Sequence, residues 1–535
     1  MATVSNRIPT GRSSERPQAA AGAERPDIIG ARAARTLPGL FRARVARTPD
    51  KPAYRHYDEA RATWVDTTWR EMGHHVERWI NALAAEGYEA GERVAVMLRN
   101  SREWVMFDQA ALALGLVVVP LYVNDRADNC AYILRDTGAR LLLVAGIEQW
   151  RPIAEHETAL PALRRVVTLS HAPAQGSDRF VVDIATWLDR GIDDYTLPAT
   201  APDDLATIVY TSGTLGRPKG VMLSHYNILW NVEASLKPVA VRSDELFLSF
   251  LPLSHTFERT VGYYLPMMAG CTVAYARSIR ELAEDLRAVR PTLLISVPRI
   301  FERVHNRLLD RLEGRSLLAR ALFHKAVEVG WQEFLHRQGR ARRRVQSLLW
   351  PILERLVARK ITERMGGRVR LAICGGAPLS PDVARVFIAL GLPILQGYGL
   401  TETSPVISVN WEDDNDPASV GHPLPGCEVI TGEHDELLVR SPAVMLGYWC
   451  NQGATSQTID REGWLHTGDR ARIENGRIYI IGRLKEIIVL STGEKVPPAD
   501  MEIAIAIDPL IDQILIIGEG RSYLTAIAVL NPDRW

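Results

Sequence analysis

The 535-residue sequence has few cysteines, no long apolar run and no excess of charge of either sign. Its five cysteines are Cys130, Cys271, Cys374, Cys427 and Cys450, and no two of them form a Cys-x-x-Cys pair. This scatter argues against a disulfide framework and against a structural zinc site. It is typical of a protein that works in a reducing compartment.

No segment reaches the roughly 18 consecutive apolar residues that a membrane-spanning helix needs. The longest run, 110–123, is interrupted by Gly115 and Pro120, which predicts a buried helix followed by a core strand. The N-terminus has no continuous apolar stretch of the kind found in secretory signals. We therefore expect a cytoplasmic protein.

The charges balance, because 63 lysines and arginines face 63 aspartates and glutamates. A nucleic-acid-binding protein usually carries a basic excess, so we expect no nucleic-acid partner. With 47% hydrophobic and 24% charged residues, the chain cannot be wholly disordered, collagen-like or coiled-coil. At about 150 residues per domain, its length predicts two to four domains.

Residues 1–35 are rich in Arg, Ala, Pro, Ser and Gly and hold few large apolar residues. Such a segment buries too little surface to offset the entropy lost on ordering, so we expect a flexible tail. A transit peptide is the alternative, but Glu15, Glu24 and Asp27 count against it because such peptides are poor in acidic residues.

From residue 36 onward, short β-rich runs alternate with helical stretches such as 76–86 and 279–289. Several runs are continuous in Val, Ile and Leu, as in parallel strands that are covered on both faces. The pattern predicts an α/β fold with mostly parallel sheets. The predicted strands are Arg93–Leu98, Val117–Leu121, Arg140–Val144, Arg165–Leu169, Leu205–Tyr210, Leu246–Leu251, Thr292–Val297, Val369–Ile373 and Glu436–Arg440.

Residues 301–366 differ, because they hold many Arg, Leu and Glu and only one proline, Pro351. We expect a mostly helical insertion. Its basic stretch 337–344 could contact anionic lipid, which would make the protein weakly peripheral to a membrane. The alternative for that stretch is an ordinary solvated helical face.

The strongest chemical signal is the segment 210–220, YTSGTLGRPKG, which directly follows an apolar strand. Glycines let backbone N–H groups approach phosphate oxygens, hydroxyls add donors, and the lysine adds a positive charge. The spacing matches neither the Walker loop nor the dinucleotide fingerprint. A plain surface loop is the alternative, but we expect a phosphate-binding loop of another type.

Two further clusters carry polar groups after apolar runs. The first, 396–403 (QGYGLTET), offers a flat tyrosine ring and a glutamate suited to Mg²⁺. The second, 463–469 (GWLHTGD), ends in an aspartate that could accept both hydroxyls of a ribose. Each of them alone also fits a structural turn.

Taken together and in this order, the three motifs resemble the adenylate-forming superfamily of acyl-CoA synthetases, adenylation domains and luciferases. The resemblance runs from about residue 38 to the end, and 462–502 looks especially like the fatty-acyl-CoA synthetases. Leu215 departs from the family loop, which usually has Thr there. The resemblance implies a large, multi-subdomain adenylation domain at 36–484 and a small α+β C-terminal domain at 485–535.

In that superfamily a carboxylate attacks the α-phosphate of MgATP, which gives an acyl-adenylate and pyrophosphate. A thiol, usually that of coenzyme A, then displaces AMP. No protein nucleophile is required, which agrees with the lack of a Ser-His-Asp, Cys-His or Gly-x-Ser-x-Gly pattern. The resemblance therefore implies a ligase of a long-chain fatty acid and coenzyme A that uses ATP and Mg²⁺.

The resemblance also assigns nucleotide-binding residues. The loop that would hold the β- and γ-phosphates comprises Thr211, Ser212, Gly213, Thr214, Gly216 and Lys219. The adenine site would be lined by Gly375, Gly376, Ala377, Pro378, Gly397, Tyr398 and Gly399, with the tyrosine ring stacked on the base. Thr401 would reach the α-phosphate, and Glu402 would bind Mg²⁺. Asp469 and Arg483 would bind the ribose hydroxyls.

Three more assignments concern catalysis and coenzyme A. His255 matches the family histidine near the junction of acyl group and phosphate. Lys485 matches the hinge about which the C-terminal domain rotates between the two half-reactions. Gly493 lies in the loop expected to line the pantetheine tunnel. The residues expected to act in catalysis are thus His255, Thr401, Glu402 and Lys485.

One family feature has no counterpart, namely the late lysine that contacts the substrate carboxylate and α-phosphate. The last lysine here is Lys495, which belongs to the loop 493–496. We therefore expect an incomplete C-terminal unit and a chain that binds MgATP but adenylates weakly. Two alternatives stay open: an acyl-AMP ligase that loads a carrier protein, and a non-catalytic nucleotide- or acyl-binding protein. Dependence on coenzyme A separates the first alternative from the ligase, and ATP binding without turnover would support the second.

Overall fold

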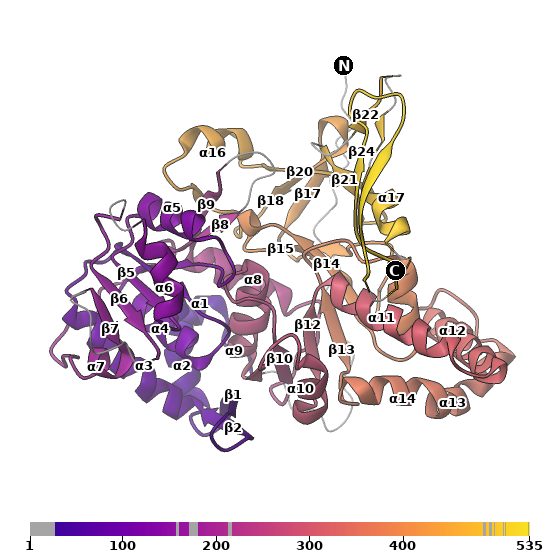
Figure 1. Ribbon diagram of the computed structural model, residues 1–535, viewed down its shortest axis with the longest axis horizontal. Helices are drawn as coiled ribbons and strands as arrows, with labels where there is room; N and C mark the ends of the chain where they lie inside the picture. The colour runs from indigo at the N-terminus through magenta and orange to yellow at the C-terminus, as the bar shows by residue number, and fades with distance from the viewer. Residues whose placement is uncertain are drawn as a thin grey trace.

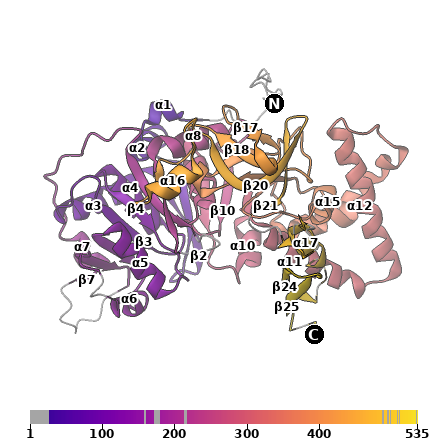
Figure 2. The same ribbon diagram turned by 90° about the horizontal axis from the view of Figure 1, so that it is seen from above.

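The structure is a computed structural model. It describes residues 27–156, 160–170, 180–211, 217–484, 488–491, 495–496, 498–506, 508, 510–532 and 534–535. Two large sheets with helices between and outside them form most of the molecule, and a helical insertion lies at one end (Figures 1 and 2). The predicted α/β class with mostly parallel sheets is confirmed.

The first large sheet has eight strands. Six consecutive strands of its spatial order, from β8 to the edge strand β7, pair in parallel. In spatial order its strands are β19 (Gly447–Tyr448), β9 (Lys219–Ser224), β8 (Leu205–Thr211), β4 (Val117–Pro120), β3 (Arg93–Met97), β5 (Leu141–Val144), β6 (Arg165–Thr168) and β7 (Val181–Asp183). β9 pairs antiparallel with β8, and these two strands form the β8–β9 hairpin on either side of residues 212–216.

The second large sheet has nine strands with a parallel centre and antiparallel edges. In spatial order its strands are β16 (His422–Pro423), β15 (Val406–Val409), β14 (Ile394–Gly399), β13 (Leu371–Cys374), β12 (Leu293–Ser296), β10 (Leu246–Ser249), β11 (Thr272–Tyr275), β1 (Pro52–Asp58) and β2 (Thr63–Thr68).

Alternate residues of the central strands point into different apolar cores, which explains their continuous apolar sequences. Val94 and Val96 belong to a core shared by both sheets, whereas Ala95 and Met97 lie in a core on the other side of the first sheet. Leu294 faces a third core beyond the second sheet. The helices therefore form layers outside each sheet and between the two.

Several helices of the central layer begin at side-chain caps. Thr68 and Glu71 form a capping box at the start of α3 (Trp69–Ala85), and Ser101 caps α4 (Arg102–Ala113). The same layer also contains α1 (Ala31–Ala34), α2 (Leu37–Arg47), α7 (Ile184–Leu188), α8 (His225–Ser235), the π-helix η2 (Glu258–Tyr264) and α9 (Leu265–Ala269). The outer helices are α5 (Ala127–Thr137), α6 (Ile147–Ala154), α10 (Leu282–Val289), α11 (Pro298–Glu313) and α15 (Pro381–Ala389).

A third, antiparallel sheet packs beside these layers and carries the predicted strand Glu436–Arg440. Its strands are β17 (Glu428–Thr431), β18 (Glu436–Arg440), β20 (Leu465–Glu474) and β21 (Arg477–Arg483). Helix α16 (Gln452–Thr458) precedes β20. The last part of the chain contains β22 (Ile488–Val489), β23 (Lys495–Val496), α17 (Pro498–Ile505), β24 (Ile511–Ile517) and β25 (Thr525–Leu530).

Residues 301–366 are mostly helical, as expected, although the first helix already begins at Pro298. Beyond α11 they form α12 (Leu317–Arg337), η3 (Val345–Leu349), α13 (Trp350–Leu353), η4 (Glu354–Ala358), α14 (Arg359–Thr362) and η5 (Glu363–Met365). No helix in the described part of the chain is both long and apolar enough to cross a bilayer.

The expectation of a flexible tail over residues 1–35 is wrong for its last part, residues 27–35, which pack against the rest of the molecule. Ile29, Ala31 and Ala34 are buried, and Asp27 pairs with the buried Arg44 at 2.8 Å. The few apolar residues of this stretch suffice because they pack into a core that the rest of the chain already forms. Residues 1–26 lie outside the described residues.

Candidate active site

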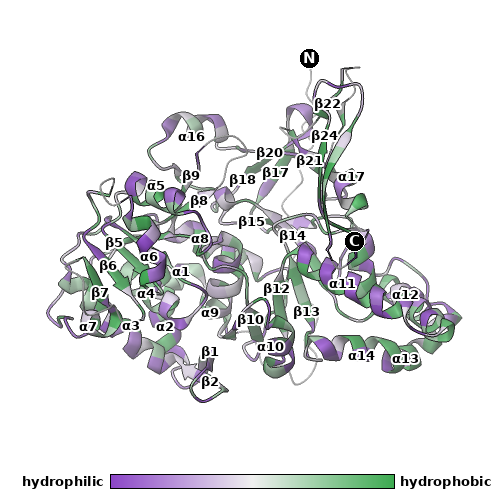
Figure 3. Cartoon of the chain, in the orientation of Figure 1, coloured by the Kyte–Doolittle hydropathy of each residue, from purple (hydrophilic) through white to green (hydrophobic). Residues whose placement is uncertain are grey.

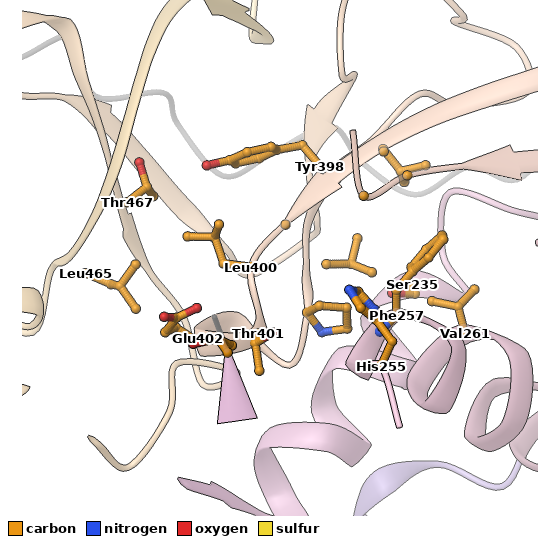
Figure 4. A pocket seen from close by; sticks show the side chains of 18 of the residues that line it. Ser235, His255, Phe257, Val261, Tyr398, Leu400, Thr401, Glu402, Leu465 and Thr467 are labelled. Atoms are coloured by element: carbon orange, nitrogen blue, oxygen red, sulfur yellow. The ribbon is translucent and has the colours of Figure 1, made fainter. Parts of the chain in front are cut away.

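A cavity of about 660 Å³ lies where the carboxyl ends of β13 and β14 approach the third sheet and the β8–β9 hairpin. Ligand sites of open α/β sheets commonly lie at the carboxyl ends of the strands. One wall carries Tyr398, Thr401 and Glu402, and the other carries His255, Phe257 and Val261 (Figure 4). The cavity therefore has polar groups at one end and apolar groups at the other.

Glycines let the chain approach the cavity closely. Gly376 follows β13 with φ of +83°, a left-handed conformation that favours glycine. A Cβ on Gly399 would lie 1.9 Å from the Pro405 carbonyl oxygen, so no larger residue fits at the end of β14. The glycine-containing ends of β13 and β14 therefore bring the backbone to the cavity near Tyr398.

Tyr398 and Asp469 are joined directly. The Tyr398 hydroxyl donates to Asp469 Oδ2 at 2.5 Å, and Arg483 Nε lies 3.2 Å from Asp469 Oδ1. Asp469 and Arg483 are cross-strand partners on β20 and β21, so the ladder fixes this pair. Burial raises the pKa of Asp469, and the hydrogen bond from Tyr398 and the charge of Arg483 favour its ionised form. Burial also raises the pKa of Tyr398, which keeps its hydroxyl a donor.

A second chain of contacts links the hairpin with Glu402. Lys219 Nζ lies 4.8 Å from the centre of the Tyr448 ring, and the Tyr448 hydroxyl donates to Glu402 Oε1 at 2.7 Å. Thr211, which pairs in register with Lys219, also borders the cavity. A cation, a carboxylate and a hydroxyl thus meet at one end of the cavity, where they can receive a phosphate chain and a hard metal ion.

His255 opens onto the cavity from the wall that also carries Phe257 and Val261, opposite Glu402. Its Nδ1 accepts a hydrogen bond from the backbone N–H of Phe257 at 3.1 Å, which leaves the proton of the neutral ring on Nε2. Desolvation by the surrounding walls lowers the pKa of His255 below its usual 6.5, so the ring is neutral near pH 7. A neutral Nε2–H can donate to an oxygen of a bound group.

The apolar part of the cavity extends along η2, the start of α9 and the middle of the second sheet. Phe257, Val261 and Leu265 follow one another at four-residue spacing, and all three line it. The other apolar residues that line this part are Val239, Val241, Phe247, Leu293, Ile373, Val406 and Val409. An elongated hydrocarbon chain fits such a surface.

The structure brings most of the predicted site residues to this one cavity. Those that border it are Thr211, Lys219, His255, Gly375, Gly376, Gly397, Tyr398, Gly399, Thr401, Glu402 and Arg483. Asp469 contacts two of them. Ala377 and Pro378 follow in the same loop but do not border the cavity, because the chain turns outward at Gly376 and exposes them. Ser212, Gly213, Thr214, Gly216, Lys485 and Gly493 lie outside the described residues.

The sequence reasoning missed Tyr448, Glu436 and His466, which also border the cavity. Glu436 accepts from the backbone N–H of Gly468 at 2.9 Å and lies 2.9 Å from His466 Nδ1. It thereby holds the turn before Asp469. His466 lies inside the 463–469 motif and could have been found there, whereas Tyr448 and Glu436 belong to no motif that the sequence singles out.

Comparisons with known proteins agree with this geometry. Residues 41–449 match the AMP-binding enzyme family, and residues 485–534 match the AMP-binding enzyme C-terminal domain. The long-chain-fatty-acid–CoA ligase FadD15 of Mycobacterium bovis is 32% identical over 90% of this chain and 80% of its own. The chloroplastic long-chain-fatty-acid–[acyl-carrier-protein] ligase AEE15 of Arabidopsis thaliana is 30% identical over 93% of this chain and 77% of its own.

A solved structure shares the fold. The anthranilate CoA ligase AuaEII in complex with anthranoyl-AMP superposes with a TM-score of 0.73 at 20% identity, over 93% of this chain and 87% of that one. The family match covers well over half of the chain and includes the cavity walls from Thr211 to Tyr448. The chain therefore belongs to the AMP-binding enzymes and is an adenylate-forming, acyl-activating enzyme that binds ATP in this domain.

Proposed function

We propose that the protein activates a long-chain fatty acid with MgATP and passes the acyl group to coenzyme A. The observation that carries this proposal is a single cavity with nucleotide-type groups at one end and a hydrocarbon-lined wall at the other. The relative FadD15, whose name states this activity, supports the same choice of substrate.

In this proposal the nucleotide occupies the polar end. Tyr398 stacks on adenine, and Asp469 and Arg483 bind the ribose hydroxyls. Thr211 and Lys219 hold the β- and γ-phosphates with Ser212, Gly213, Thr214 and Gly216. The hydrogen bond from Tyr398 to Asp469 supports these roles, because it fixes the ring and the carboxylate relative to each other.

Glu402 would hold Mg²⁺. The fit is good because Mg²⁺ commonly uses only one or two protein carboxylates and completes its shell with phosphate oxygens and water. Glu402 borders the cavity, and only one of its oxygens is bonded by Tyr448 in the described structure. When bound, the ion would neutralise charge on the phosphates.

The remaining roles concern the acyl carboxylate. It would lie between the two ends of the cavity, where the neutral His255 donates from Nε2 and Thr401 reaches the α-phosphate. The fatty acid oxygen then attacks that phosphorus as pyrophosphate leaves, and the protein contributes position and charge rather than a nucleophile. Lys485 as hinge and Gly493 in the pantetheine tunnel remain proposals for the second half-reaction.

A second candidate is transfer of the acyl group to a carrier protein. It is favoured by the relative AEE15, whose name states an acyl-carrier-protein ligase. The adenylation half-reaction is the same in both candidates, so the cavity does not distinguish them.

The spacing of Phe257, Val261 and Leu265 provides a test of the long-chain substrate. These residues lie successively further from His255 along one helix, so Leu265→Trp would fill the far end of the apolar part. We expect L265W to lower kcat/KM for long acids by about tenfold or more, because overpacking one apolar site typically costs about 1–3 kcal/mol. Short acids and ATP affinity should be unaffected. An equal loss for short and long acids would contradict a hydrocarbon channel along this helix.

A further inference from the structure

The outer side of the helical insertion carries a row of exposed apolar side chains. Their exposed fractions are 84% for Val345, 67% for Leu348, 46% for Leu349, 59% for Ile352 and 46% for Leu356. The segment that holds them is continuously helical from η3 through α14, so intervals of three, one, three and four residues place them on one face. We call these five residues the outer stripe.

The inner face of the same segment is already buried against other helices of the molecule. Ser347, Trp350, Leu353 and Ala358 are buried, and the last three belong to the apolar core that α12 and α15 complete. The segment is therefore apolar on two opposite faces, and packing within the insertion accounts for only one. Figure 3 shows α13 and α14 along the lower edge of the insertion, where hydrophobic and hydrophilic residues both occur.

Basic residues flank the outer stripe. Between residues 342 and 364 the chain has seven arginines and lysines but only two acidic residues, although the whole chain is neutral. Arg342, Arg343 and Arg344 are consecutive and exposed immediately before the stripe, and Arg355 and Lys360 are exposed along it. A large apolar face bordered by cations is the composition of a helix that lies in the surface of an anionic bilayer.

The structure also divides the basic stretch 337–344 into two parts. Arg337 pairs with Glu333 within α12 at 3.2 Å, and Arg340 pairs with Asp414 at 3.2 Å, so both cations already have a carboxylate partner. The three arginines that follow, at 342–344, are exposed. The cations available to a partner are therefore those that lie next to the apolar residues.

We propose that the outer stripe and its flanking arginines dock the protein on an anionic lipid surface. The five apolar side chains enter the interface, and the arginines contact lipid phosphates and carboxylates. A second copy of the chain fits this face less well, because a twofold contact would set the arginines of both copies against each other. Leu317 and Leu318, 80% and 79% exposed between Arg315 and Arg320, repeat the same combination at the start of α12.

The test is sedimentation of the full chain with phosphatidylcholine vesicles, with and without phosphatidylserine. We expect binding only to the anionic vesicles, weakened by salt. L348S/I352S and R342Q/R343Q/R344Q should each weaken it by about tenfold or more. The matched controls, I192S/I279S and R61Q/R126Q/R151Q, change exposed residues elsewhere and should bind like the parent.

Equal binding to neutral vesicles, no binding by the parent, or equal losses in variants and controls would each overturn the proposal. Light scattering adds a further outcome: a parent dimer that L348S/I352S converts to a monomer, with no vesicle binding, would assign the stripe to a second copy. Because all these positions are exposed, melting temperatures should stay within a few degrees of the parent. The assay uses neither ATP nor an acyl group, so its outcome is independent of the proposed function.

Discussion

At the level of single residues, two hydrogen-bonded pairs lie at one end of the cavity. Tyr398 donates to Asp469, and Tyr448 donates to Glu402. In each pair a tyrosine fixes a carboxylate that the proposal gives to the ligand. In each tyrosine the ring and the hydroxyl have different roles. Substitution by Phe removes only the hydroxyl, and substitution by Ala removes both.

Tyr398 separates stacking from positioning. Tyr398→Ala removes the ring, and we expect ATP affinity to fall about 10- to 100-fold, because stacking on an aromatic side chain contributes about 1–3 kcal/mol per base. Tyr398→Phe keeps the ring and should stay within a few-fold of the parent. Isothermal titration calorimetry with ATP checks both variants, and equal losses in Y398F and Y398A would contradict stacking as the main role.

Glu402 should control the metal requirement. Glu402→Gln removes the negative charge of a proposed metal ligand. We expect the Mg²⁺ concentration for half-maximal adenylation to rise about tenfold or more, because a hydrogen bond or contact to a charged group contributes about 1.5–3 kcal/mol. Tyr448→Phe is the matched control, because it removes the hydrogen bond but leaves the carboxylate. Pyrophosphate release measured over a Mg²⁺ titration provides the comparison. An unchanged Mg²⁺ dependence in E402Q would remove Glu402 from the metal site.

At the element scale, the π-helix η2 connects the cavity wall to the interior. Its first residue, Glu258, is fully buried, and Oε1 accepts from Ser249 Oγ at 2.6 Å. Among the described residues Oε2 has no hydrogen-bond partner. Burial raises the pKa of Glu258 to about 8, so its carboxyl is mostly protonated at neutral pH. The same helix carries Val261 into the apolar part of the cavity.

This burial gives stability a defined dependence on pH. Between the unfolded pKa near 4.5 and the folded pKa of about 8, the unfolded chain releases a proton that the folded protein keeps. The contribution of Glu258 is thus fully present below pH 4.5 and is lost as pH rises through 8, by at most about 1.4 kcal/mol per pH unit. Glu258→Gln cannot titrate, so its melting temperature relative to the parent should rise from pH 5 to pH 8.

The exposed Glu284→Gln is the control for that comparison and should follow the parent at every pH. Differential scanning fluorimetry over the range suffices. If the difference in melting temperature between E258Q and the parent stays constant with pH, the pKa of Glu258 is the same in the folded and unfolded states.

At the scale of the whole molecule, a buried ion pair ties the layers together. Asp108 of α4 pairs with Arg259 of η2, which also donates to Thr207 Oγ1 of β8 at 2.7 Å. Tyr264 donates to Asp108 Oδ2 at 2.7 Å. The pair therefore joins the first large sheet to the helix that lines the cavity.

Breaking this pair should be costly. Asp108→Ala leaves the Arg259 charge buried, and we expect a loss of about 3–5 kcal/mol. The double variant D108L/R259M replaces both charges with apolar groups and should lose less than the single variant. Melting temperatures rank the three proteins, and a double variant less stable than D108A would contradict this explanation.

The sequence predicts the fold class and much of the polar site, because both rest on local patterns. Several central strands, such as β4 and β5, are continuous apolar runs, and the segments 396–403 and 463–469 carry their chemistry in adjacent residues. Strand ends differ by at most two residues; Leu246–Leu251, for example, stops at Ser249, whereas Glu436–Arg440 has both ends as predicted. The apolar wall could not be predicted, since Val239, Leu293 and Val406 come from separate elements. Tyr448 and Glu436 reach the site only through tertiary packing.

The proposed reaction is the activation of a long-chain fatty acid through its adenylate. The most direct measurement is mass spectrometry of the full chain incubated with MgATP and fatty acids of increasing length, with and without coenzyme A. The account predicts acyl-adenylate without coenzyme A, acyl-CoA and AMP with it, and more product from long acids than from short ones. Bound ATP without acyl-adenylate or acyl-CoA from any fatty acid would contradict it.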